Sequence, residues 1–241
     1  MNAGRASFPA TRWTLVAAAR DSDDPASHRA LASLCESYWY PLYAFARRRG
    51  DSPDEARDHT QAFFAQFLEH KYFDAADPQR GRFRTFLRTA FQHYLADAAD
   101  HSRAHKRGGG VAPLPFEISG GEERYIREPA HGESPERIFE RRWARTLLDA
   151  AEARLRAEVA RDSSAPDFDR LKSCLQGEAD AAYANLARDL RINEGALKVR
   201  IHRMRKRYGE LIRLEVAEIV KDPSDIDAEL RYLIKALAPA V

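Results

Sequence analysis

Apolar residues recur along most of this chain at steps of three and four positions, the spacing that gathers them on one face of an α-helix. The first such face comprises Leu31, Leu34, Cys35, Tyr38, Leu42 and Phe45. Pro41 falls inside this pattern and is expected to kink the helix there. Asn-Gly hairpin turns and alternating apolar runs, the usual signals of β-structure, do not accompany the helical pattern. We therefore predict an all-α fold.

The second predicted helix begins at a clear sequence signal. Ser52 is a favourable N-cap, Pro53 suits the first helical position, and Glu55 completes a capping box three residues after the serine. The apolar face of this helix consists of Phe63, Phe64, Phe67 and Leu68. A loop around 74–81 separates it from a third long helix, predicted over about 83–105.

A change in composition after the third helix indicates the domain boundaries. Residues 108–133 begin with three glycines, are rich in Gly, Pro and Glu, and have no helical period, so we predict a flexible linker there. Helical patterning then resumes and contains a helix-turn-helix. The chain is thus expected to hold two small helical domains, 1–107 and 134–215, joined by this linker and followed by a C-terminal helical extension over 216–241.

The composition fits a helix-rich chain of one or two domains, with 241 residues, 44% of them hydrophobic and 32% charged. No stretch reaches the roughly 18 consecutive apolar residues of a membrane span, so we expect no membrane contact. Cys35 and Cys174 are the only cysteines, and no His or Cys cluster has metal-ligand spacing, so we expect a cytoplasmic protein without a disulfide scaffold or a zinc site. Because Gly-rich phosphate loops and the GxSxG and HExxH motifs are also missing, we expect no enzyme, cofactor or metal.

The net charge of +2 conceals two basic blocks. Residues 80–110 carry seven Lys/Arg against two Asp, and residues 188–213 carry nine Lys/Arg against three acidic residues. Between them, residues 111–136 are acidic, with six Glu against two Arg. This distribution is typical of a chain that touches nucleic acid in two places.

The segment 183–207 combines a short helix, a tight turn and a second helix. Asn193 can cap the second helix, whose inward stripe consists of Leu197, Ile201, Met204, Tyr208 and Leu211. Small or basic residues occupy its opposite face and flanks, as a helix that enters the major groove requires. The candidate DNA contacts are Asn193, Lys198, Val199, Arg200, His202, Arg203 and Lys206. The alternative is an amphipathic surface helix whose Lys and Arg are only solvated.

Two runs of the chain resemble a known family of transcription proteins. Residues 183–207 resemble domain four of the extracytoplasmic-function (ECF) sigma factors of bacterial RNA polymerase, and residues 30–107 resemble their domain two. Within the latter, Pro53–Phe64 is similar to the polymerase-binding helix, and Phe83–Leu87 is similar to the start of the promoter-opening helix. Phe8–Trp13 and the C-terminal extension resemble features of a subgroup associated with serine/threonine protein kinases.

The resemblance implies a promoter-specificity subunit that binds the beta-prime and beta subunits of core RNA polymerase and recognises minus-ten and minus-thirty-five promoter DNA. The implied polymerase contacts are Asp58, Gln61 and Phe64. The implied minus-ten contacts are Arg80, Arg82, Arg84, Arg88, Gln92 and His93. Arginine contacts with phosphates can offset the few kcal/mol that flipping a base out of the stack costs. Phe83 and Phe86 could stack on bases or pack in the core.

The chain departs from the family pattern in its turn and in its polymerase-binding helix. Arg191 stands where the turn usually has Gly, which puts a side chain at a strained backbone position. Arg57 and Ala62 stand where carboxylates are usual. A phosphate on Thr60 would add about -1.5 to -2 charges beside Gln61 and restore that acidity, so activation by a kinase is one hypothesis. The other is that Thr60 is a buried packing residue.

The C-terminal extension carries an apolar stripe that is too regular for a solvated tail, formed by Ile226, Leu230, Leu233, Ile234 and Leu237. We expect it to dock on the 134–215 domain as extra core, with a regulatory contact on the 1–107 domain as the alternative. The alternative function for the whole chain is a free-standing helix-turn-helix regulator whose N-terminal domain binds a ligand or a protein. Such a regulator binds an operator alone, usually as a dimer, whereas a sigma factor needs core polymerase.

Overall fold

All regular structure in the described part of this computed structural model is helical, which confirms the predicted all-α class. The described residues are 25–69, 82–104, 120–127, 132–161, 168–176, 180–220 and 222–238. The chain divides into two compact units, the first made of 1–146 with 217–241 and the second of 147–216. The Phe8–Trp13 segment and Arg80 lie outside the described residues.

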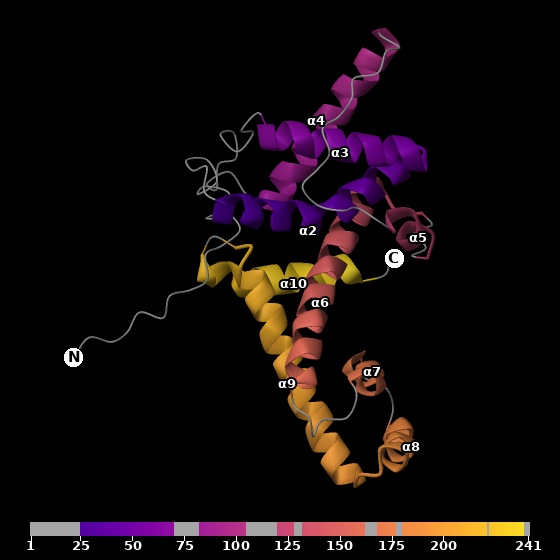
Figure 1. Ribbon diagram of the computed structural model, residues 1–241, viewed down its shortest axis with the longest axis vertical. Helices are drawn as coiled ribbons and strands as arrows, with labels where there is room; N and C mark the ends of the chain where they lie inside the picture. Colours follow the sequence, from indigo (N-terminus) through magenta and orange to yellow (C-terminus); the bar gives the residue numbers. More distant parts are fainter. Residues whose placement is uncertain are drawn as a thin grey trace, which may run out of the picture. The chain divides into compact units, whose positions relative to one another are not determined.

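The first unit is built on three long helices: α2 (Pro25–Arg49), α3 (Pro53–Glu69) and α4 (Phe83–Ala104) (Figure 1). α2 continues past Pro41, and α2 packs against α3. Aromatic rings fill the space between the helices, with the centroids of Phe63 and Phe91 5.0 Å apart. Phe83 is buried edge-on against Tyr38, at 5.5 Å between centroids, so it belongs to the core.

The predicted capping box at the start of α3 is confirmed. The Ser52 amide donates to a Glu55 carboxylate oxygen at 2.9 Å, and the Glu55 amide donates to the Ser52 hydroxyl at 3.3 Å. These two bonds satisfy amides that the first turn of a helix otherwise leaves without partners. A local sequence signal therefore determines where α3 begins.

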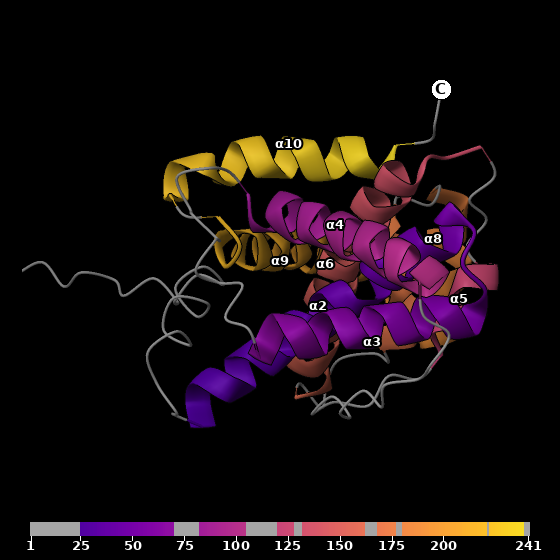
Figure 2. The same ribbon diagram turned by 90° about the horizontal axis from the view of Figure 1, so that it is seen from above.

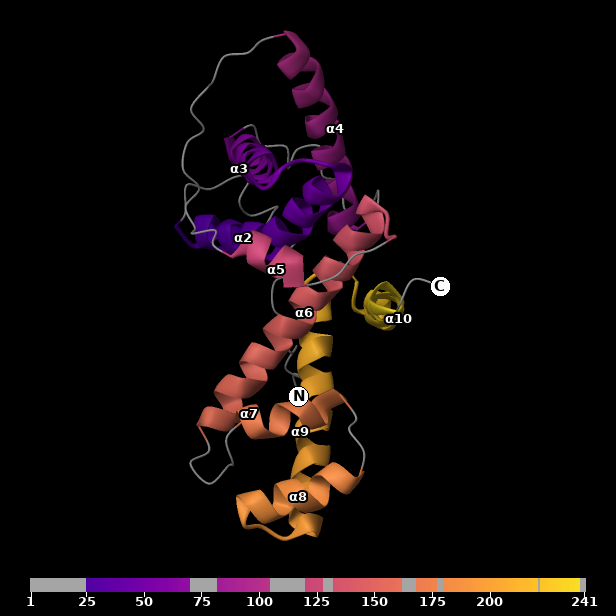
Figure 3. The same ribbon diagram turned by 90° about the vertical axis from the view of Figure 1, so that its right-hand side faces the viewer.

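Part of the predicted linker is a short helix, α5 (Gly121–Arg127), which contacts α2 (Figure 3). Glu122 accepts hydrogen bonds from the Tyr43 hydroxyl and from two nitrogens of Arg47, the latter at 2.9 and 3.0 Å. A Cβ on Gly121 would lie 2.8 Å from the Trp39 ring, so only glycine permits this approach. Tertiary contacts thus order residues that have no helical period of their own.

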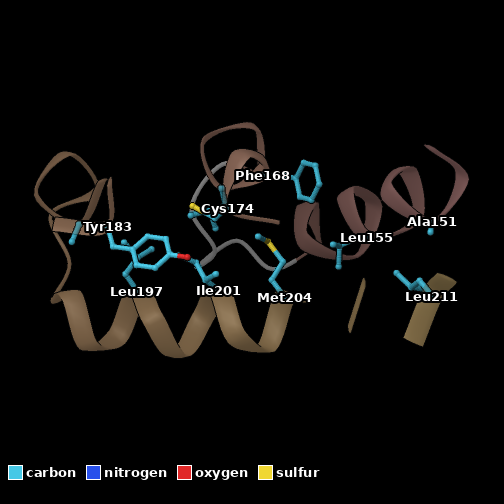
Figure 4. Close-up of a cluster of buried hydrophobic side chains, with 11 residues drawn as sticks. Ala151, Leu155, Phe168, Cys174, Tyr183, Leu197, Ile201, Met204 and Leu211 are labelled. Carbon is cyan, nitrogen blue, oxygen red and sulfur yellow. The ribbon is translucent and has the colours of Figure 1, made fainter. Parts of the chain in front are cut away.

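The second unit contains the end of α6 (Pro135–Ala160), then α7 (Phe168–Leu171), the 3₁₀ turn η3 (Lys172–Gln176), α8 (Asp180–Leu190) and α9 (Glu194–Ala217). Side chains from all of these elements form one core (Figure 4). Its buried residues are Ala151, Leu155, Phe168, Leu171, Cys174, Tyr183, Ala187, Leu197, Ile201, Met204 and Leu211. The predicted inward stripe of α9 is confirmed, with Tyr208 packed at its edge.

The C-terminal extension forms η4 (Pro223–Asp225) and α10 (Ile226–Leu237), which belong to the first unit. α10 lies beside the start of α4, which it reaches through Glu229 (Figure 2). Leu233 is buried, but Ile234 of the predicted stripe is 68% exposed. α10 also contacts α6, where the rings of Trp143 and Tyr232 lie 6.2 Å apart between centroids. Both expected docking surfaces are therefore in contact with α10, since α6 begins the predicted 134–215 domain and Arg82 and Arg84 belong to the predicted 1–107 domain.

Candidate nucleic-acid interface

A three-residue turn, 191–193, joins α8 to α9 and sets the direction in which α9 leaves. The amides of Arg191 and Ile192 donate back to the carbonyls of Arg188 and Ala187, at 3.1 and 3.0 Å. Arg191 has φ +54°, in the left-handed region that costs a residue with a side chain about 1–2 kcal/mol. The sequence predicted strain at this position, and the backbone adopts it.

Asn193 is the N-cap of α9, as predicted. Its side-chain oxygen accepts a hydrogen bond from the Gly195 amide at 2.7 Å, and its carbonyl accepts one from the Leu197 amide at 3.0 Å. A Cβ on Gly195 would lie 3.0 Å from that side-chain oxygen, so the small residue leaves room for the cap. The oxygen of Asn193 is therefore committed to the helix start, which leaves its amide nitrogen for a DNA contact.

Two arginines of the basic block hold α9 in place. Arg205 donates to the Cys174 carbonyl and to the Tyr183 hydroxyl, both at 2.8 Å. Arg207 pairs with Glu158 at 2.8 Å and with Glu210 at 2.9 Å. The hydrogen bonds to Glu158 raise the pKa of Arg207 and lower the pKa of Glu158. Only part of the block's charge is therefore directed outward.

The remaining predicted contacts share the outer side of α9. His202, Arg203 and Lys206 are exposed, and Arg200 is half-buried. Val199 is 51% exposed, and its aliphatic side chain suits apolar contact with a thymine methyl. Lys198 is exposed and pairs with Glu194 one turn earlier, at 2.9 Å. The fold thus gathers the predicted upstream contacts on one helix.

A groove of about 820 Å³ runs along this side of α9 within the second unit. Apolar side chains of α6, α7 and the turn form one wall, and cationic side chains of α9 form the other. The lining residues are Leu155, Glu158, Val159, Leu171, Ile192, Gly195, Ala196, Val199, Arg200, Arg203, Met204 and Arg207. The cationic outer side of α9 therefore lies beside a groove.

The predicted polymerase contacts on α3 fall into three environments. The side chain of Asp58 is 70% exposed, Gln61 is half-buried, and Phe64 is 1% exposed. Phe64 packs with Phe63 in the aromatic core, at 5.5 Å between centroids, so its side chain is not available to a partner in this conformation. Its position in the apolar stripe of the helix already pointed inward.

Thr60 is fully buried, and its hydroxyl donates to the Ala56 carbonyl at 2.7 Å. This is the geometry of a packing residue with its polar atom satisfied inside the helix. A kinase would reach the hydroxyl only after α3 moved away from its neighbours. The structure therefore agrees with the packing hypothesis in the described conformation.

Three of the predicted minus-ten contacts, at or just before the start of α4, are paired with carboxylates from α6 and α10. Arg84 is 4% exposed and binds Glu140 at 3.0 Å and also Glu229. Arg82 pairs with Glu229 at 2.6 Å, and Arg88 pairs with Glu140 at 2.9 Å. In this conformation Arg84 is buried and bound to two carboxylates, so its guanidinium is not available to contact DNA.

The two remaining predicted minus-ten contacts, Gln92 and His93, lie further along α4. Gln92 donates to Glu136 at 3.1 Å, whereas His93 is exposed. The sequence reasoning missed the glutamates that hold this surface. A signal existed for Glu229, which stands in register with Ile226 and Leu233 on the apolar stripe of α10. A carboxylate on a buried face requires a basic partner.

The described residues hold no group of three or more His, Cys, Asp or Glu side chains placed to bind a metal ion. Cys35 and Cys174 are buried free thiols, and burial raises the pKa of Cys35 to about 12. Among the described helices, none combines the length and apolarity that crossing a membrane would need. Comparisons with protein families, with curated proteins and with solved structures found no match to this chain.

Proposed function

We propose that this chain is a promoter-specificity subunit that binds core RNA polymerase and directs it to promoter DNA. The observation that carries the proposal is the outer side of α9. This helix has a buried apolar back, an N-cap on Asn193, and exposed His202, Arg203 and Lys206 in front. A capped, rigidly anchored helix with small and cationic residues forward fits the major groove, where Arg pairs with guanine.

Charge on the first unit supports a second contact, with the polymerase. Asp54 and Asp58 have side chains 80% and 70% exposed near the start of α3, and Arg57 pairs with them at 2.6 and 4.0 Å. A basic partner would therefore have to compete with Arg57 for these two carboxylates. In the proposal Asp58 and Gln61 meet core polymerase, and Phe64 supports them from the core. Activation by phosphorylation at Thr60 belongs to this proposal only if α3 first leaves the core to expose the hydroxyl.

One observation favours the rival function, a free-standing helix-turn-helix regulator. Arg84 and Phe64, which the sigma-factor pattern would place on DNA and polymerase, are both buried. A regulator needs only the α9 face for DNA, and its first unit would bind a ligand or a protein. The two functions differ in stoichiometry, because the regulator binds its operator without polymerase and usually as a dimer.

The α9 assignment is tested with Arg203→Ala and Lys198→Ala, measured as promoter binding by the complex of core polymerase with the full chain. We expect each variant to lose about 1–3 kcal/mol if the side chain contacts a base edge, and less if it contacts only phosphate. Arg213→Ala is the matched control, because it removes the same charge from an exposed site two turns or more along the same helix. Full promoter activity in both α9 variants would refute this assignment.

A further inference from the structure

The start of α4 presents arginines that are already bound to acidic groups of the same chain. Arg84 reaches Glu140 of α6 and Glu229 of α10, and Arg82 reaches the second oxygen of Glu229 at 2.6 Å. Glu229 is 1% exposed, so its carboxylate is enclosed by this contact. Carboxylates and phosphates present oxygen pairs that an Arg guanidinium binds in the same way. Glu229 therefore occupies donor groups that could otherwise bind a phosphate.

Two aromatic rings lie against the same guanidinium. The central carbon of Arg84 lies 4.2 Å from the centroid of Trp143 and 4.1 Å from that of Tyr232. Tyr232 comes from α10, one turn after Glu229, and it also covers Arg82 at 5.3 Å. Removing α10 would take the Tyr232 ring away from the Arg84 guanidinium. It would also take away Glu229, the carboxylate that Arg84 shares with Arg82.

The attachment of α10 is polar as much as apolar. Leu233 and Ala236 are buried, but Ile234 is exposed, and Arg137 of α6 donates to the Ala238 carbonyl at 2.7 Å. A cavity of about 340 Å³ remains where α10 meets α4 and α6. Its lining residues are Arg88, Ser134, Glu136, Arg137, Glu140, Tyr232, Lys235 and Ala236. Ion pairs lose much of their gain to desolvation, so a competing anion can displace such a contact more readily than a dry apolar interface.

We propose that α10 is an internal competitor for nucleic acid: Glu229 and Tyr232 cover Arg82 and Arg84, and a phosphate backbone binds these arginines when α10 moves away. The proposed function assigns Arg82 and Arg84 to the minus-ten element of the promoter. The regulatory role of α10 at these arginines therefore rests on the proposed function. The full chain would then have low affinity for nucleic acid at α4 until α10 is displaced.

Glu229→Gln tests the proposal in the full chain, because it removes the competing charge with little change of shape. The probe is a fluorescein-labelled 20-nucleotide single strand, titrated at several salt concentrations. We expect at least about fivefold tighter binding than wild type. Arg82 and Arg84 would each gain a phosphate contact, and each such contact with a single strand steepens the plot of log binding constant against log salt concentration by about 0.7. The slope should therefore become steeper by up to about 1.4. Asp225→Asn is the control, since it removes an exposed carboxylate just before α10 and should change neither quantity.

The melting temperature of the variant and the amide hydrogen exchange of the wild-type chain show whether α10 competes with nucleic acid or only stabilises the fold. If Glu229→Gln lowers the melting temperature without any gain in strand binding, α10 is only a structural brace and the proposal fails. Exchange in the wild-type chain avoids the risk of a variant that does not fold. Adding the strand should increase amide exchange in α10, and unchanged protection in the bound complex would overturn the proposal.

Core polymerase binding, measured in parallel, distinguishes this inference from the proposed function. Tighter strand binding by Glu229→Gln without any polymerase complex would support the competitor in a DNA-binding protein that is not a sigma factor. A stable polymerase complex with no change in strand binding would overturn the competitor and leave the proposed function standing.

Discussion

Arg84 and Arg203 carry the same guanidinium group in opposite surroundings. Arg84 is enclosed by two carboxylates and two aromatic rings, and burial lowers its pKa against the opposing effect of Glu140. Arg203 is exposed on the outer side of α9. The family resemblance assigned Arg84 to DNA and the helical pattern assigned Arg203, but neither shows which charges are neutralised inside the fold. The difference between the two residues determines which one can contact DNA without a change of conformation.

Thr60 can be tested through stability. Thr60→Val keeps the shape and removes the hydroxyl, so we expect the free energy of unfolding to fall by about 0.5–1.5 kcal/mol. Thr60→Glu would bury a charge without a partner and should cost about 3 kcal/mol or more. Urea denaturation followed by circular dichroism measures both variants. If Thr60→Glu is as stable as wild type, the site accepts charge and the packing hypothesis is wrong.

His59 predicts a pH dependence of stability. The hydrogen bond to Asp51, 3.0 Å from Nδ1 to the carboxylate oxygen, raises the pKa of the imidazole above 6.5. Because the folded-state pKa is the higher one, the stabilisation is complete below about pH 6.5 and is lost as pH rises through the raised value. We expect the stability advantage of wild type over His59→Gln to be larger at pH 5.5 than at pH 8.5. An advantage that does not change with pH would contradict this.

Among the helices, those with local signals were predicted well and those that depend on distant contacts were not. The capping box of α3 and the Asn193 cap of α9 each lie within a few residues of the helix they start. In contrast, α5 depends on Arg47, 75 positions away from its partner Glu122. A segment of seven residues has too few internal hydrogen bonds to form a stable helix alone. Its absence from the sequence prediction therefore has a physical reason.

The strained turn before α9 predicts a stabilising substitution. Arg191→Gly removes the side chain from a left-handed position, so we expect the free energy of unfolding to rise by up to about 1 kcal/mol, after the entropy cost of glycine. Arg188→Gly, inside α8, is the matched control and should lower it by about 1 kcal/mol. Thermal unfolding of both variants measures the difference. Equal destabilisation by the two glycines would mean that Arg191 is not strained.

For the whole molecule, the two basic blocks of the sequence differ in how far their charges are exposed or paired in the fold. The block around α9 keeps an exposed cationic face beside a groove, whereas the described arginines at the start of α4 are bound by glutamates. The sequence could predict the first site because capping, stripe and charge all lie within 183–207. It could not predict the second arrangement, because Arg84 and Glu229 are 145 positions apart and only the fold brings them together. The chain therefore combines one open candidate surface with one covered one.

The most direct test of the central claim is transcription initiation by purified bacterial core RNA polymerase, with and without the full chain, on genomic DNA of the organism that encodes the chain. We predict that the chain forms a stable complex with core polymerase and produces initiation at discrete start sites, which Arg203→Ala weakens and Arg213→Ala leaves intact. The contradicting result is a chain that forms no complex with core polymerase and produces no new start sites, yet binds a specific DNA site by itself.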